Sequence, residues 1–219
     1  MDNNYYYRTY RGEEVAIEKE ICISVAMPNI MRTEKDLEEK IEKAIFPYKA
    51  GGKIIDENEL SFKYPKAYDF LLSNKQLLLE RDKGKAKDYL IWYAYGRTQG
   101  MHNQGKKLLI PYMAERGVAI ESKEESLLFY CGYALFFTDD MEMTLIKRLI
   151  ESKVFWYYIK NTSKPYSKGY MALAKNYIKD FGVPDMTDSQ KRLLLETEQG
   201  DEREKMIADL YRVPYEMIK

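Results

Sequence analysis

The stretch FWYYIKNTSKPYSKGYMALAKNYIKDFGVP (residues 155–184) places two helical patterns on either side of a polar loop. In the first pattern, Phe155 and Ile159 recur at the spacing of one helix face, which predicts that they pack in a core. Pro165 ends this helix, because the residue before a proline disfavours helical backbone. The second pattern covers residues 175–181 and ends at a Gly-x-Pro sequence, a common helix stop. The stretch therefore predicts two helices joined by an exposed loop.

The loop between the two patterns, SKPYSKGY (residues 163–170), combines lysine, tyrosine and small residues. No apolar pattern around Tyr166 and Tyr170 would bury their rings. Tyrosine offers a stacking face together with a hydroxyl that donates or accepts hydrogen bonds. We therefore expect part of this loop to be functional surface.

Helical patterns also dominate the sequence on both sides of this stretch. The longest predicted helix begins at residues 138–140 and continues to Ser163. Residues 188–199 and 201–211 predict a terminal helical hairpin joined at Gly200.

The amino-terminal two thirds of the chain read instead as short strands and turns. Helices are predicted there over residues 34–43, capped by Thr33, and over residues 65–82. The predicted strands cover residues 5–10, 13–18, 44–47, 89–95, 106–113, 117–122 and 127–137. The sequence thus predicts an α+β fold, with a β-rich part (residues 1–137) followed by a helical part (residues 138–219) of the same domain.

The composition describes a globular chain of 219 residues with 45% hydrophobic residues, 20 tyrosines and a net charge of zero. Zero net charge by itself argues against a general binder of nucleic acid or of membrane surfaces. No apolar run approaches the roughly 20 residues that span a bilayer. Cys22 and Cys131 are far apart and indicate reduced thiols in a cytoplasmic protein.

No catalytic centre is recognisable in the sequence. It contains no G-x-G-x-x-G or Walker motif and no Pro-Pro-aromatic sequence, which amino-methyltransferases use to hold an extruded base. A Ser-His-Asp triad would have to use His102, the single histidine, within GMHNQG. His102 and the two cysteines cannot complete a tetrahedral zinc site without carboxylates. We therefore expect neither catalytic nor metal-binding residues.

The zero net charge is an average over unlike segments. Residues 153–179 contain six lysines and no acidic residue, and residues 89–114 carry Arg97, Lys106 and Lys107, again with no acid. Both windows are rich in aromatic residues, a combination that suits a phosphate backbone together with base edges. Arg97 and Gln99, in the turn YGRTQG, could make bidentate hydrogen bonds to guanine and adenine.

These windows also allow other interpretations. A basic window can be the solvated face of a helix, and a protein-interaction surface has a similar composition. An enzyme whose site escapes motif analysis is a further alternative, and converging carboxylates in a pocket would indicate it.

The sequence of both basic windows, together with several other stretches, resembles the TaqI-like carboxy-terminal specificity domain of adenine-specific DNA methyltransferases. Such domains occur in bacterial type II restriction–modification enzymes, including fused methylase–nuclease forms. The matching stretches keep the order of the family: RGEEVAIEKEI (11–21), IFPY (45–48), YPKAYDFLL (64–72), WYAYGRTQGM (92–101), KKLLIPYMA (106–114), YCGYALF (130–136) and the stretch at 155–184.

The resemblance implies target recognition without catalysis. In this family a separate amino-terminal domain binds S-adenosylmethionine and methylates an extruded adenine, while the specificity domain reads bases, mainly through the major groove. The expected fold is a twisted β-rich recognition lobe followed by a helical lobe. The expected partners are double-stranded DNA and a methyltransferase domain or subunit, with no membrane and no cofactor bound by this chain. The chain would be an excised fragment or a stand-alone recognition subunit.

The resemblance and the window chemistry together predict a set of DNA-contacting residues. They are Arg97, Gln99, Lys164, Tyr166, Ser167, Lys168, Tyr170, Lys175 and Asn176. For Arg97 a structural alternative stands beside this role, namely an ion pair with a carboxylate that supports the lobe. Trp92, Phe155 and Trp156 are assigned to the core.

Overall fold

The computed structural model describes residues 3–98, 100–101 and 104–219, which form two compact units. The first unit comprises Met1–Val25 and Glu42–Gln104, and the second comprises Ala26–Ile41 and Gly105–Lys219. Helices and small sheets occur in both units, so the predicted α+β class is confirmed.

The first unit begins with an antiparallel hairpin of β1 (Tyr5–Tyr10) and β2 (Glu13–Glu18). Arg11 and Gly12 connect the strands with positive φ angles of 53° and 87°, as tight two-residue hairpin loops require. A second antiparallel pair is formed by β3 (Cys22–Ala26) and β4 (Glu42–Ile45).

Helices and a buried core complete the first unit. The helices are α2 (Glu57–Lys63), α3 (Pro65–Ser73) and α4 (Lys75–Leu79), with 3-10 turns at Lys19–Ile21 and Arg81–Asp88. The Glu18 carboxylate at the end of β2 accepts hydrogen bonds from the amides of Lys66 and Ala67, and so satisfies the first turn of α3. The core is formed by Ile21, Ile55, Leu60, Ala67, Trp92 and Tyr93.

The second unit is built on a three-stranded antiparallel sheet. Its central strand β5 (Lys106–Pro111) pairs with β7 (Ile120–Ser122) on one side and with β9 (Gly132–Phe137) on the other. Two further short strands, β6 (Met113–Ala114) and β10 (Met171–Ala172), pair with each other, and β8 covers Leu128–Phe129. The 3-10 turn Pro28–Ile30 and α1 (Glu34–Lys40) belong to the same unit.

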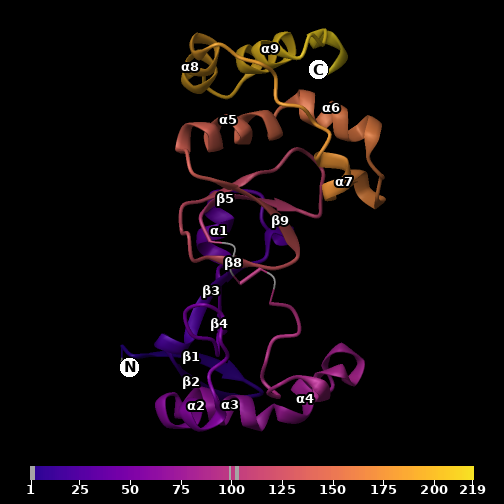
Figure 1. Cartoon of the computed structure of the whole chain (residues 1–219). Coiled ribbons are helices and arrows are strands. Elements are labelled where there is room, and N and C mark those ends of the chain that lie inside the picture. The colour runs from indigo at the N-terminus through magenta and orange to yellow at the C-terminus, as the bar shows by residue number, and fades with distance from the viewer. Residues whose placement is uncertain (1–2, 99, 102–103) are drawn as a thin grey trace. The chain divides into compact units, whose positions relative to one another are not determined.

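Helices cover this sheet in layers, as Figure 1 shows. Helices α5 (Asp140–Ile150) and α6 (Lys153–Thr162) lie between the sheet and the terminal pair α8 (Asp188–Glu196) and α9 (Asp201–Leu210). Shorter elements are α7 (Lys175–Ile178) and 3-10 turns at Ser167–Gly169 and Tyr215–Met217. The predicted terminal helices are confirmed, and Gly200 directly precedes α9.

The units do not divide at residue 137/138, where the β-rich and helical parts were expected to meet. The inner side of α5 and α6 packs on the sheet, so Leu108, Ile120, Met143 and Phe155 share one core. Residues 26–41, far away in sequence, join the same unit.

The long helix expected over residues 138–163 is two helices. The break falls at Ser152, whose side-chain oxygen accepts a hydrogen bond from the Phe155 amide at 3.2 Å, while Glu204 accepts one from the Lys153 amide at 2.8 Å. These contacts satisfy the amino-terminal amides of α6 that a new helix leaves unpaired.

Two predictions in the first unit are wrong. Residues 89–95 form turns rather than a strand, because Trp92 and Tyr93 pack inward and hydrogen-bond to Glu57 and to the Ile55 carbonyl. The helix predicted over residues 65–82 is interrupted at Asn74. Helix α2, capped by the side chain of Asp56, was not predicted. Tertiary packing decides strand formation for aromatic residues more than their intrinsic preference does.

Candidate nucleic-acid interface

The segment Lys164–Ala172 forms a tight antiparallel hairpin. The Tyr166 amide donates to the Tyr170 carbonyl at 2.7 Å, and the Ala172 amide donates to the Lys164 carbonyl at 2.9 Å. At the tip, Lys168 and Gly169 have φ angles of 60° and 78°. The backbone of this loop is therefore held by its own hydrogen bonds. We call residues 164–170 the basic loop.

Strand pairing anchors the carboxyl end of the basic loop to the sheet unit. β10 pairs with β6, and the Leu173 amide donates to the Tyr112 carbonyl at 2.8 Å. The Tyr112 amide in turn donates to the Asn29 side chain at 2.8 Å, and the Tyr112 ring meets Tyr133 edge-on at 4.9 Å. The structure thus brings the end of the first basic window, residues 112–114, against the second.

The side chains at the tip of the basic loop face solvent. Lys164, Ser167 and Lys168 are exposed, and Tyr166 retains 47% of its surface. Within the described residues, neither lysine forms an ion pair, so both charges are available to a partner. Such a loop can place two point charges, a phenol and a hydroxyl against a polyanion.

Tyr170 differs from the other residues of the basic loop, because it is half-buried at its base. The guanidinium of Arg32 lies 5.9 Å from the centre of the Tyr170 ring, and Arg32 also pairs with Glu115 at 3.5 Å. Burial opposes ionisation of Glu115, but its own backbone amide, Arg32 and the Tyr170 hydroxyl outweigh burial and lower the pKa of this carboxyl. Tyr170, predicted to contact DNA, is thus part of the support of the loop.

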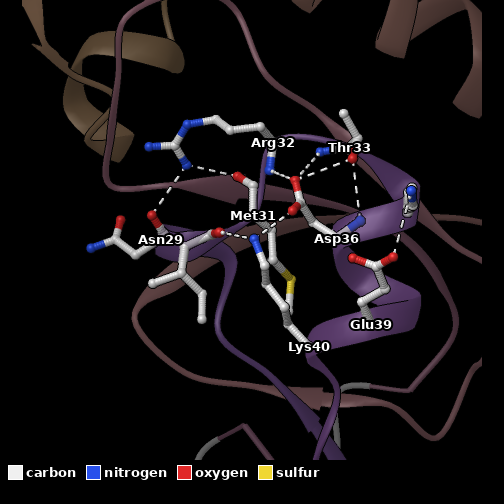
Figure 2. Close-up of polar contacts among 9 residues, drawn as sticks. Asn29, Met31, Arg32, Thr33, Asp36, Glu39 and Lys40 are labelled. Carbon is white, nitrogen blue, oxygen red and sulfur yellow. Dashed lines mark hydrogen bonds and ion pairs between the residues drawn. The ribbon is translucent and has the colours of Figure 1, made fainter.

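Arg32 is the supporting residue that the sequence did not reveal. Figure 2 shows its guanidinium donating to the carbonyls of Asn29 and Met31, at 3.1 and 2.7 Å. Its backbone amide donates to Asp36, which also accepts from the Thr33 amide in the capping box of α1. The T-x-x-D spacing predicts the cap, but no local signal links Arg32 to a tyrosine 138 positions away.

Several lysines of the basic windows are committed to the fold. Lys106 pairs with Asp140 at 2.7 Å and Lys153 with Asp201 at 3.6 Å. Lys107 is completely buried and donates to the carbonyls of Glu124, Glu125 and Leu127. The acid-free stretches of sequence are therefore partly neutralised by acids from outside them, and the free positive charge concentrates on the basic loop and its neighbours.

The remaining predicted residues do not belong to the basic loop. Arg97 belongs to the first unit, where it is exposed, and no carboxylate among the described residues pairs with it. Gln99 lies outside the described residues. Lys175 and Asn176 are exposed on α7, which follows the basic loop in the second unit. The structure therefore brings Lys164, Tyr166, Ser167 and Lys168 together in one element.

Comparison with known proteins does not identify this chain: no family model matches it, and neither does any curated protein. In the described part of the chain, no group of three or more His, Cys, Asp or Glu side chains is placed to hold a metal ion. No helix within that part is long and apolar enough to cross a membrane.

Proposed function

We propose that this chain is the double-stranded DNA recognition domain of an adenine methyltransferase from a restriction–modification system. The observation that carries the proposal is the basic loop: a backbone braced by Arg32 and β6 that exposes Lys164, Lys168 and Tyr166. A rigid loop loses little conformational entropy on binding, which favours its use in recognition.

The residues of the loop divide into two roles. Lys164 and Lys168 neutralise phosphates, which positions the domain without regard to sequence. The hydroxyls of Tyr166 and Ser167 reach polar atoms of the groove, and Arg97, in the other unit, reads guanine through its two parallel donors. Methylation belongs to a separate domain or subunit that binds S-adenosylmethionine, so this chain alone is not catalytic.

Salt-dependent binding tests the phosphate contacts. We expect the full chain to bind a labelled duplex weakly, with log K falling against log salt at a slope near −4 to −5 if about five cations meet phosphates. The double variant Lys164→Ala/Lys168→Ala should reduce that slope by about 2 units. The matched control is Lys205→Ala/Lys219→Ala, which removes two exposed lysines near the carboxyl terminus. A flat salt response, or the same change in the control, would refute the proposal.

Base recognition needs a separate test, because phosphate contacts carry no sequence information. Selection from a random duplex library should yield a preferred site, and Tyr166→Phe or Arg97→Lys should relax that preference more than it weakens overall binding.

The proposal also predicts that a Pro-Pro-aromatic methylase motif is encoded immediately upstream of this chain or in a neighbouring gene. Its absence from both places would count against the assignment.

A second candidate function is a module that docks onto a methylase or nuclease subunit. Two adjoining grooves of about 350 and 390 Å³ on the second unit share Glu142, Ile146 and Val183. Val183, which lines both grooves, and Met141, which lines the second, are 58% and 51% exposed, so both offer apolar surface to a partner. If docking is the main role, Val183→Asp should abolish assembly with the subunit while Lys164→Ala/Lys168→Ala leaves it intact.

A further inference from the structure

The first unit contains a cavity of about 690 Å³ between the β1–β2 hairpin and the β3–β4 pair. This volume lies in the range of small-molecule sites. Its principal lining residues are Tyr6, Arg8, Tyr10, Cys22, Lys43 and Phe70. The cavity lies wholly within one unit and involves no residue of the basic loop.

Strand geometry explains why these side chains converge. Alternate residues of a strand share a face, so Tyr6, Arg8 and Tyr10 of β1 point to the same side of the hairpin. Their partners across the ladder include Ile17 opposite Tyr6 and Val15 opposite Arg8, and both also line the cavity. The hairpin thus presents aromatic, cationic and aliphatic groups on one surface.

The interior of the cavity suits a planar ring. The rings of Tyr10 and Phe70 meet edge-on with centroids 5.1 Å apart, and Val15, Ile17 and Ile45 add aliphatic contacts. Aromatic walls favour a flat ligand, because stacked and edge-on contacts add to the gain from burial.

The charges around the cavity favour an anionic ligand. Lys19 and Lys43 place their ammonium groups 5.3 and 5.7 Å from the centre of the Tyr6 ring, so this ring already has cations beside it. Arg8 is exposed on the same face of β1, and no ion pair engages it among the described residues. A cationic ligand would be repelled here. Glu42 also lines the cavity and would disfavour a ligand with several negative groups.

Cys22 does not make the cavity a site of covalent chemistry. Burial, with a smaller contribution from Glu18, raises the pKa of the Cys22 thiol to about 11. At neutral pH the thiol therefore stays protonated, and the thiolate is the nucleophilic form. The lining residues are suited to reversible binding.

We propose that this cavity binds a nucleotide, with the base packed against the aromatic side chains of the cavity wall and a single phosphate at Arg8 and Lys43. The nucleotide can come from two sources, a free nucleoside monophosphate or an unpaired nucleotide of a nucleic-acid strand. The site is independent of duplex recognition by the basic loop, so either assignment can fail without the other.

Ligand-observed NMR and calorimetry on the full chain test the site. The probes are the four 5′-monophosphates, their nucleosides, inorganic phosphate, decanoate and a 5′-phosphorylated tetranucleotide. We expect saturation transfer to base protons of at least one monophosphate, and affinity at least tenfold above that of its nucleoside. Tighter binding of the tetranucleotide would identify the strand as the source, and equal binding would identify the free nucleotide.

Variants separate the phosphate contact from a general loss of structure. Arg8→Ala should weaken monophosphate binding about tenfold and leave nucleoside binding within twofold, whereas Arg8→Lys should retain most of the affinity. Arg192→Ala, which removes an exposed arginine of α8, is the control. The proposal is overturned if no nucleotide binds at millimolar concentration, if decanoate or phosphate alone binds as well, or if Arg192→Ala has the same effect as Arg8→Ala.

Discussion

Replacing Lys107 with methionine removes a fully buried ammonium group from the centre of the second unit. In the folded chain this group donates to the carbonyls of Glu124, Glu125 and Leu127 at 3.1, 2.9 and 2.9 Å, and it lies 5.7 Å from the centre of the Phe136 ring. Methionine keeps the length and apolar stem of the side chain but supplies no donor. The three carbonyls of this turn would then lose their partner.

The expected loss of stability follows from two opposing terms. Hydrogen bonds from a charged donor contribute about 1.5–3 kcal/mol each, so three of them set an upper bound of several kcal/mol. Burial lowers the pKa of Lys107, which means that the fold holds the ammonium at a cost that methionine avoids. We therefore expect Lys107→Met to destabilise the second unit by about 2–4 kcal/mol.

The neighbouring residue provides a matched control. Lys106→Met removes an exposed ion pair with Asp140 and should therefore have a much smaller effect on stability than Lys107→Met. Urea unfolding, followed by the fluorescence of Trp156 in a Trp92→Phe background, reports on the second unit. Equal stability of the two variants would refute the view that Lys107 organises the turn at residues 124–127.

Three further predictions concern the packing, pH response and loop support of the second unit. A Cβ on Gly117 would lie 1.9 Å from the Ile150 carbonyl oxygen, so Gly117→Ala should destabilise the fold by about 3 kcal/mol or more in thermal unfolding, while Gly182→Ala, with open space around its Cα, should not. Burial raises the pKa of Glu34, but hydrogen bonds from the Glu121 amide and Lys147 outweigh it and lower the pKa overall. The folded pKa is thus below the unfolded value of about 4.3, and stability should be present above that pH and be lost as pH falls below it. Glu34→Gln should therefore reduce the fall in the free energy of unfolding as pH decreases, measured by urea titrations at pH 3–6. An unchanged fall would contradict this role of Glu34. Arg32→Gln should speed hydrogen exchange of the Tyr170 and Ala172 amides without altering exchange in β1, and unchanged exchange in the loop would argue against its supporting role.

Local sequence patterns predicted much of the secondary structure. The strands at residues 5–10 and 13–18, the cap of α1 at Thr33 and the terminal helices around Gly200 were predicted from residues close together in the chain, and all are confirmed. Their physical causes, such as turn chemistry and helix capping, operate over a few residues. An exposed loop was also predicted from the lack of an apolar pattern around Tyr166 and Tyr170; Tyr166 is exposed, but Tyr170 is half-buried beside Arg32.

Two of the mispredicted elements depend on distant partners. Helix α6 starts at Ser152 partly because Glu204 accepts a hydrogen bond from its first amide, and residues 89–95 are held by aromatic side chains that reach Ile55 and Glu57. The role of Lys107 depends on carbonyls 17 to 20 positions away. None of these partners falls within the window over which a periodic pattern can be detected.

The sequence by itself determined the α+β class, the helix cap at Thr33 and the presence of two acid-free basic windows. Only the tertiary structure decided which of those charges face a partner: Lys107 is buried, Lys106 and Lys153 are paired, and Lys164 and Lys168 remain exposed. The reason is that charge is a local property of the chain, whereas the free energy of a charge depends on the carboxylates, carbonyls and water that folding places around it.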